Sequence, residues 1–245
     1  YESSGKGWVP AFRLGPRKST LANLPEDETR FPASTWLKGL LMDGVRQYVL
    51  NSRLMRNPSP PHLQRELRPD GSNLPWVVAD LERRTPERHR AWIEHLRSAL
   101  PDLANVTTVE RAEDRHRYIV LEYDGGLRVP SWLASDGTLR LLALTIPAYI
   151  AGFSGVLLIE EPENGIHPRA VETMFQSLSS VYDAQILLAT HSPVILSVTD
   201  VHDVLCFARN QDGATDIVSG DQHPSLHDWQ GETNLGTLFA SGVLG

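Results

Sequence analysis

The chain has 245 residues, 41% of them hydrophobic, which is enough to bury a substantial core in one large domain or two lobes. Its single cysteine, Cys206, excludes an intramolecular disulfide framework, and the sequence shows neither a secretory signal nor an apolar run long enough to cross a bilayer. We therefore expect a cytoplasmic protein without a membrane partner.

The charges are distributed unevenly around a formal net charge of −7. Residues 1–150 hold 21 of the 23 Lys and Arg residues and 18 acidic residues, whereas residues 151–245 hold 2 basic and 12 acidic ones. The densest basic groups can meet nucleic-acid phosphates or pair with interspersed acids on helix surfaces, and the pattern favours the ion pairs. These groups consist of Arg83, Arg84, Arg88, Arg90, Arg97, Arg111, Arg115 and Arg117.

The first 130 residues contain signals for helices, turns and short strands. We expect loop and short strands in the polar residues 1–33, and a helix from Thr35 to about Met55, before the break at Asn57-Pro-Ser-Pro-Pro. No heptad repeat persists, so we expect no long coiled coil. Further helices are predicted over residues 74–83 and 86–100, and strands over residues 106–110, 118–123 and 127–129, with a turn at 124–126.

A glycine-bearing helix start follows at Ser135-Asp-Gly-Thr. Ser135 or Asp136 can cap the helix, and Gly137 allows a ligand to approach the backbone closely. Free N–H groups at a helix N-terminus, together with a hydroxyl, suit a phosphate group. Taken alone, however, the segment favours an ordinary capped amphipathic helix.

Two adjacent carboxylates end an apolar run at residues 156–162, Val-Leu-Leu-Ile-Glu-Glu-Pro. The run is typical of a strand that is buried on both faces, as in a parallel sheet. Ionised Glu160 and Glu161 at the end of such a strand are costly unless a cation meets them, and Mg²⁺ with a nucleotide is the usual solution. The alternative is a strand whose acids simply emerge into solvent.

A second apolar run, Gln185-Ile-Leu-Leu-Ala-Thr-His-Ser-Pro, ends at His191 and Ser192. Between the two runs, Pro168 suits the first position of a helix, and apolar residues recur at helical spacing as far as Leu178. This is a strand–helix–strand unit, which is normally parallel and right-handed. Glu160, Glu161 and His191 therefore share the carboxyl edge of the sheet, where ligands bind in such folds. A terminal hairpin is predicted from residues 203–208 and 215–219.

The order of these segments resembles the C-terminal half of an ABC-type ATPase head of the RecF/SMC kind, and more narrowly the AAA15 ATPases that are close to OLD-family proteins. Ala134-Ser-Asp-Gly-Thr is similar to the signature motif, with Asp136 in place of a glycine. Leu157-Leu-Ile-Glu-Glu-Pro resembles Walker B, with Glu160 in place of the commoner aspartate. Glu163-Asn-Gly-Ile-His-Pro resembles the D-loop, with His167 in place of its aspartate. Ala189-Thr-His-Ser-Pro is similar to the switch histidine motif.

The resemblance implies an α/β P-loop NTPase fold, with a mainly parallel central sheet and an inserted helical and β region. It also implies that Glu160 holds Mg²⁺, that Glu161 activates the attacking water, and that His191 contacts the γ-phosphate of ATP. Further residues would meet the nucleotide held by an opposite subunit or line the same interface. They are Ser135, Asp136, Gly137, Thr138, Asn164 and His167.

A phosphate-binding loop of the form Gly-x-x-x-x-Gly-Lys-Ser/Thr does not occur in the sequence. Ser4-Gly-Lys-Gly and Gly15-Pro-Arg-Lys-Ser-Thr match only in part. We expect that a lobe carrying this loop lies upstream or in a partner chain. The alternative is a degenerate ATPase that does not hydrolyse ATP.

We therefore expect an ATP-hydrolysing switch module that works as a homo- or heterodimer and controls a separate effector, such as a nuclease, in bacterial anti-phage defence. The alternatives are a DNA-repair or chromosome-maintenance ATPase that contacts nucleic acid, and a scaffold that does not hydrolyse ATP. The expected division of the chain is an N-terminal helical and β-hairpin region (1–130), an ATPase motif core (131–200) and a C-terminal hairpin with a terminal helix (201–245).

Overall fold

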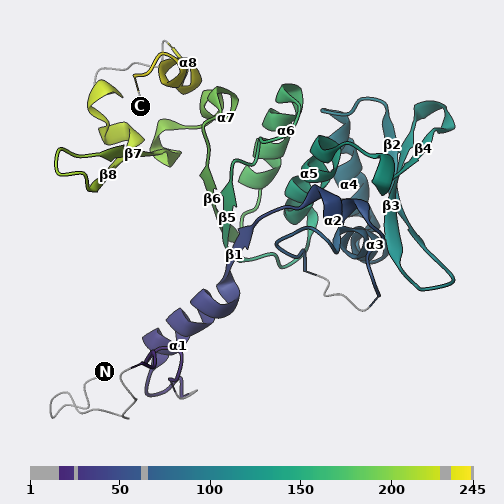
Figure 1. Cartoon of the computed structure of the whole chain (residues 1–245), viewed down its shortest axis with the longest axis horizontal. Helices are drawn as coiled ribbons and strands as arrows, with labels where there is room; N and C mark the ends of the chain where they lie inside the picture. Colours follow the sequence, from purple (N-terminus) through teal and green to yellow (C-terminus); the bar gives the residue numbers. More distant parts are fainter. Residues whose placement is uncertain (1–16, 25–26, 62–65, 227–232, 244–245) are drawn as a thin grey trace.

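Figure 1 shows the chain as a computed structural model, which describes residues 17–24, 27–61, 66–226 and 233–243. Within these ranges the strands form one parallel sheet and two antiparallel sheets. We expected loop and short strands in residues 1–33. Residues 1–16 of that segment lie outside the described part of the chain. Residues 17–24 and 27–31 contain turns rather than strands.

The parallel sheet has the strand order β1-β5-β6 and carries the acidic and histidine motifs. β5 (Gly155–Glu160) lies in the middle, and α6 (Pro168–Ser179) connects it to β6 (Ala184–Ala189). Glu160 is paired in register with Ala189. The predicted strand–helix–strand unit and the α/β class are confirmed.

The prediction that β5 is buried on both faces is wrong, because among the described residues only one of its faces is fully buried. Leu157 and Ile159 are buried in the main core, whereas Val156 and Leu158 on the other face are half-buried. In β6, Leu187 is 43% exposed. Figure 1 shows α5 (Asp136–Thr145) and α6 on one side of this sheet, so the helices in this part of the chain cover only one of its faces.

The helix predicted from Thr35 to about Met55 is wrong in its second half. α1 (Pro32–Gly39) continues as a π-helical turn through Gly44, and the chain then forms β1 (Val45–Tyr48) and the short α2 (Ser52–Arg56). Val45 pairs with Val156 and Tyr48 with Ile159 at the edge of the parallel sheet. Strand pairing therefore outweighs the helical spacing of these apolar residues, because tertiary contacts override weak local preference.

The predicted helices and strands between residues 74 and 130 are confirmed. α3 (Leu74–Arg84) and α4 (Pro86–Arg97) precede an antiparallel sheet of β2 (Leu103–Glu110), β3 (Arg117–Tyr123) and β4 (Arg128–Pro130). Gly125 and Gly126 both have positive φ angles, 82° and 86°, as the tight turn between β3 and β4 requires. At 12 residues each, α4 and α6 are the longest α-helices in the described ranges.

Buried polar contacts join α4, α5 and α6 around Thr145. The fully buried Trp92 of α4 donates its indole N–H to Thr145 Oγ1 over 2.8 Å. Ser177 Oγ of α6 donates to the Thr145 carbonyl over 2.9 Å. These helices belong to one hydrophobic cluster that reaches from Tyr48 to Ile195. The start of α5 and the carboxyl edge of the parallel sheet are therefore held by the same core.

The C-terminal segment forms a separate small cluster. The short α7 (Pro193–Ser197) leads to the predicted hairpin of β7 (Leu205–Arg209) and β8 (Thr215–Ser219), and α8 (Leu235–Ala240) follows. Leu196, Leu226 and Leu235 are buried together there. Cys206 of β7 is half-buried.

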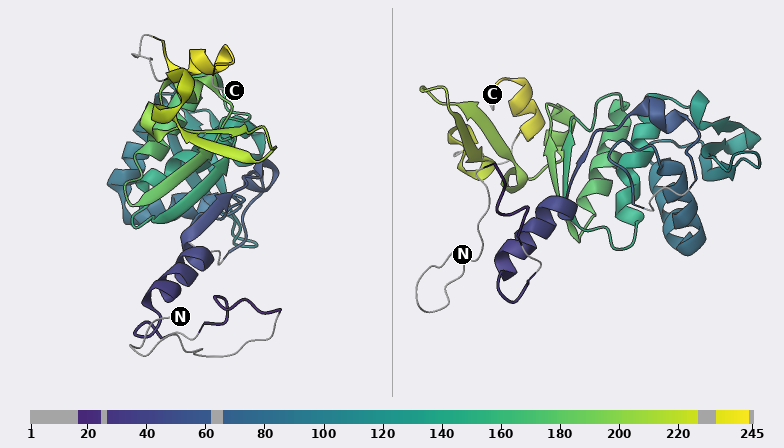
Figure 2. Two further views of the ribbon diagram at one scale, coloured as in Figure 1. Left: turned by 90° about the vertical axis from the view of Figure 1, so that its left-hand side faces the viewer. Right: turned by 60° about the horizontal axis from the view of Figure 1, so that its bottom comes forward.

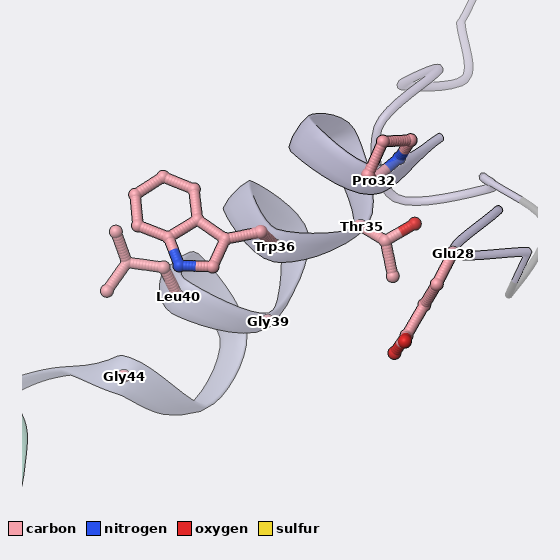
Figure 3. Close-up of a pocket in the computed structure, with 7 residues that line it drawn as sticks. All are labelled: Glu28, Pro32, Thr35, Trp36, Gly39, Leu40 and Gly44. Atoms are coloured by element: carbon pink, nitrogen blue, oxygen red, sulfur yellow. The ribbon is translucent and has the colours of Figure 1, made fainter. Parts of the chain in front are cut away.

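α1 projects from the body of the molecule next to β1, as Figures 1 and 2 show. None of its residues is buried, and Trp36 is 67% exposed. A hollow of about 600 Å³ lies along this helix (Figure 3). It is lined by Glu28, Pro32, Thr35, Trp36, Gly39, Leu40 and Gly44. Within the described ranges, no helix has the length and apolar character needed to cross a membrane.

Candidate functional site

Glu160 and Glu161 lie where the central parallel strand ends. Glu160 is the last residue of β5, and the Glu161 N–H donates to the Ala189 carbonyl of β6 over 2.8 Å. Both side chains are exposed. Glu161 has a φ of +43°, a left-handed backbone conformation that is unusual for a residue with a side chain. Such conformations are found mainly at functional sites. The backbone therefore turns sharply between the two carboxylates.

The D-loop segment (residues 163–168) forms a tight turn between β5 and α6. The Asn164 N–H donates to the Glu161 carbonyl over 3.0 Å, and the Ile166 N–H donates to the Glu163 carbonyl over 2.9 Å. His167 is the N-cap of α6, and its Nδ1 accepts the Arg169 N–H over 3.2 Å. Asn164 and His167 are both exposed. Each is therefore accessible to a ligand or a partner.

The signature segment (residues 134–138) begins α5 as the sequence predicts. Ser135 is the N-cap, and its Oγ accepts the Thr138 N–H over 3.0 Å. The two hydroxyl oxygens, Ser135 Oγ and Thr138 Oγ1, lie 2.8 Å apart. Ser135 and Asp136 are exposed, whereas Gly137 and Thr138 are half-buried.

Arg56 of α2 anchors the signature segment, a role that sequence reasoning missed. Its Nη1 lies 2.6 Å from Asp136 Oδ1, and its Nε and Nη2 donate to the Ala134 carbonyl over 3.2 and 2.9 Å. Ser131 Oγ donates to the Arg56 carbonyl over 2.9 Å. Asp136, which stands where the resemblance expects a glycine, is thus partnered within its own chain. No local pattern in the sequence links residues so far apart.

The signature segment and the D-loop segment touch each other through Gly137. A Cβ built on Gly137 would lie 2.3 Å from the Gly165 carbonyl oxygen, a distance that side chains do not tolerate. Gly165 has a φ of +77°, which favours glycine. In this structure the backbone that approaches Gly137 is therefore that of Gly165. The predicted contact of Gly137 with a nucleotide stays a prediction.

Thr190 and Glu163 join the ends of β5 and β6 by a side-chain hydrogen bond. Thr190 Oγ1 donates to Glu163 Oε1 over 2.6 Å and accepts the Ser192 N–H over 3.0 Å. Both residues are half-buried. Glu163 belongs to the segment that resembles the D-loop, and Thr190 belongs to the segment that resembles the switch histidine motif. The resemblance implies roles for other residues of these segments, but none for Glu163 or Thr190.

His191 follows Thr190 and has an exposed side chain. Its ring stacks on Phe239 of α8, with centroids 6.4 Å apart and planes inclined by 29°. Ser192 Oγ accepts the Ile195 N–H over 3.5 Å and so begins α7. Since Glu160 is in register with Ala189, the carboxylate pair and the histidine follow adjacent strands at one edge, as predicted.

The exposed Glu160 carboxylate fits the Mg²⁺ ligand that the resemblance implies, because Mg²⁺ in nucleotide sites takes one or two carboxylates together with phosphate oxygens. The described residues contain no group of three or more His, Cys, Asp or Glu side chains that could hold a metal ion by themselves.

Several arginines of the dense basic groups form ion pairs with nearby acidic residues, as the sequence pattern predicts. Asp80 pairs with Arg83 and Arg84, and Glu110 pairs with Arg115 and Arg117. Arg111 pairs with Asp114.

A model of the AAA_21 family, described as "AAA domain, putative AbiEii toxin, Type IV TA system", matches residues 3–197. The chain belongs to this family. Its membership confirms the predicted class of fold and an AAA-type domain. The narrower likeness to AAA15 and OLD-family proteins stays a prediction.

Among relatives of this AAA_21 chain, protein ea59 of Escherichia phage lambda is 29% identical over 86 residues, or 34% of this chain and 16% of that protein. This match therefore spans only a small part of the relative. A solved structure from a study of ATP-driven dimerization and DNA-stimulated activation of SMC ATPases is 16% identical, with a TM-score of 0.42, over 58% of this chain and 88% of that chain. The Smc head domain from Pyrococcus yayanosii is 20% identical, with a TM-score of 0.41, over 56% of this chain and 27% of that chain.

Proposed function

We propose that this chain carries the catalytic motifs of an ATP-hydrolysing switch. The observation that supports the proposal most is the Glu160–Glu161 pair at the end of the middle parallel strand, with Glu161 held in a left-handed backbone conformation beside the end of β6. Membership of an AAA-domain family supports the same activity. The carboxyl edge of a parallel sheet is also where ligands bind in α/β folds.

In this proposal the residues act mainly by positioning and by charge, as phosphoryl transfer requires. Glu161 orients the attacking water toward the γ-phosphate and accepts a proton from that water. His191 donates a hydrogen bond to that phosphate and senses its loss. Glu160 would hold Mg²⁺, which supplies charge neutralisation on the phosphate oxygens when it is bound.

We further propose that the module works as a homo- or heterodimer with ATP between two subunits. Ser135, Asp136, Asn164 and His167 are all exposed, and the contact of Gly137 with Gly165 holds the signature and D-loop segments together. The two segments therefore lie next to each other, which supports a shared role at a subunit interface. In this proposal Thr138 contributes through its hydroxyl group, which lies beside Ser135.

The phosphate-binding loop of such an enzyme would come from outside these 245 residues, either in the same natural polypeptide or in a partner. The intact mass and N-terminal sequence of the natural polypeptide test this part of the proposal. A segment ending in Gly-Lys-Ser/Thr upstream would support catalysis by one polypeptide. A natural chain without such a segment would either need a partner that supplies the loop or not hydrolyse ATP, and it would favour the scaffold alternative.

Glu161→Gln in the natural polypeptide tests the catalytic assignment. We expect ATP hydrolysis to fall by about 100-fold or more, since a general base typically contributes 10²- to 10⁴-fold. ATP binding should persist, and dimer should accumulate in the presence of ATP. Steady-state hydrolysis, nucleotide binding and light scattering measure the three properties.

Glu172→Gln, the same chemical change on the exposed face of α6, is the matched control and should hydrolyse ATP like the parent. A Glu161→Gln variant with the parent rate would show that Glu161 is not the general base.

We propose that the biological role is control of a separate effector, such as a nuclease, in the cytoplasm during bacterial anti-phage defence. The family description, which names a type IV toxin–antitoxin system, supports a role of this kind. Plaque counts on cells that carry the natural gene or its Glu161→Gln variant test it. Equal plaque counts with and without the natural gene would contradict the defence role.

A further inference from the structure

Glu163 makes a strong hydrogen bond that fixes the loop carrying His191. Its Oε1 accepts the Thr190 hydroxyl over 2.6 Å. A distance of about 2.5–2.7 Å is typical of a hydroxyl that donates to an ionised carboxylate, and such bonds are about twice as strong as neutral ones. The bond therefore ties the turn after β5 to the loop after β6.

Thr190 uses the same oxygen atom to shape the backbone around His191. Thr190 Oγ1 accepts the Ser192 N–H over 3.0 Å, so the residues on both sides of His191 belong to one hydrogen-bonded unit. Ser192 is in turn the N-cap of α7. Displacement of the Thr190 hydroxyl would free the backbone on which the His191 ring is carried.

The turn that carries Glu163 also lies next to α5, where the Arg140 side chain comes within 3.9 Å of the position that a Cβ on Gly165 would take. Arg140 lies on α5, and its Nε, like Glu163 Oε2, is buried without a hydrogen-bond partner. Burial lowers the pKa of Arg140, and the carboxylates of Asp136 and Glu163 act in the opposite direction. Glu163 is thus hydrogen-bonded to the loop after β6, and the turn that carries it packs against the start of α5 where Gly165 meets Gly137.

We propose that Glu163 and Thr190 form a positioning pair that holds His191 in its productive orientation. This inference rests on the proposed ATPase function. Neither residue has to touch the nucleotide: Glu163 acts through Thr190, and Thr190 acts through the backbone of His191.

Thr190→Val in the natural polypeptide tests the pair, because it removes the hydroxyl while nearly preserving the shape of the side chain. We expect kcat to fall by about 10- to 100-fold, since small displacements of a catalytic group have effects of this size. KM and the Kd for ATP should stay within about twofold of the parent. Thr190→Ser restores the hydroxyl and should recover most of the parent kcat.

Glu163→Gln keeps an acceptor oxygen but removes the charge, and it should lower kcat in the same direction as Thr190→Val. Glu172→Gln is its matched control and should leave kcat unchanged. This variant also gives an answer if Thr190→Val does not fold, because the carboxamide fills the same space as the carboxylate.

A double-mutant cycle with His191→Ala separates a positioning role from a general structural one. If Thr190 acts through His191, then Thr190→Val should lower kcat very little in the His191→Ala background. Equal losses in both backgrounds would overturn the proposal, as would a parent-like kcat in both Thr190→Val and Glu163→Gln. Loss of ATP binding in step with loss of kcat would also overturn it. A parent that does not hydrolyse ATP would instead contradict the proposed function, and this inference with it.

Discussion

At the scale of single residues, Gly137 and Gly165 bring together two motifs that lie almost thirty residues apart. The Gly165 carbonyl occupies the space where any other residue at position 137 would place its Cβ. Glycine in the signature segment is therefore required by packing within the chain, whether or not a nucleotide approaches it. The same contact holds the D-loop turn beside the N-terminus of α5.

Gly137→Ala should destabilise the protein by about 1–3 kcal/mol, because the added methyl group meets backbone that must move away. Urea unfolding measures the change in the free energy of unfolding. Gly39→Ala is a suitable control, since its Cβ meets nothing within 4 Å and alanine favours a helix. A Gly137→Ala variant as stable as the Gly39→Ala variant would contradict the importance of the Gly165 contact.

At the scale of elements, α2 holds the start of α5 in place. Arg56 reaches from α2 to the Ala134 carbonyl and to Asp136, and Ser131 Oγ bonds back to the Arg56 carbonyl. The Asp136 side chain is 56% exposed, so solvent weakens its ion pair. The bonds to the carbonyl of the buried Ala134 are therefore the larger part of the interaction.

Arg56→Gln should lower the free energy of unfolding by about 1–2 kcal/mol, since it shortens the side chain and removes a charged donor from the Ala134 carbonyl. Arg53→Gln changes an exposed arginine of the same helix and should alter stability by less than about 0.5 kcal/mol. Chemical unfolding of the two variants in parallel makes the comparison. Equal effects would show that the position of Arg56 carries no special weight.

At the scale of the whole molecule, the described residues contain a large hydrophobic cluster and a small one. The large cluster spans the proposed boundary between residues 130 and 131, and it includes Trp92 and Leu142. The small cluster of Leu196, Leu226 and Leu235 lies mostly beyond the proposed boundary at residue 200. We therefore propose that residues up to about 200 unfold as one unit, whereas the C-terminal hairpin and α8 can open separately.

Leu235→Ala should speed amide hydrogen exchange in the C-terminal segment and leave β5 almost unchanged, because it removes a contact from the small cluster alone. Leu142→Ala should lower the stability of the whole core by about 2–5 kcal/mol and speed exchange throughout it. Native-state hydrogen exchange distinguishes the two patterns. Equal acceleration of β5 and the hairpin in Leu235→Ala would contradict independent opening.

The sequence by itself determined the features that depend on local chemistry. The Ser135 cap, the start of α6 at Pro168 and the glycine turn between β3 and β4 all follow from preferences of neighbouring residues. The parallel arrangement of β5 and β6 follows from the strand–helix–strand order, because the crossover helix returns the chain so that the next strand runs in the same direction. Together these features are sufficient to predict that Glu160, Glu161 and His191 lie at one edge of the sheet.

Only the tertiary structure decided the features that depend on distant partners. Residues 45–48 have apolar residues at helical spacing, yet they become β1 because β5 offers them backbone hydrogen bonds and a core face. Arg56 with Asp136, Glu163 with Thr190, and Gly137 with Gly165 meet across long stretches of chain. No periodicity or capping preference records such contacts, because their energy exists only once the separate segments have packed together.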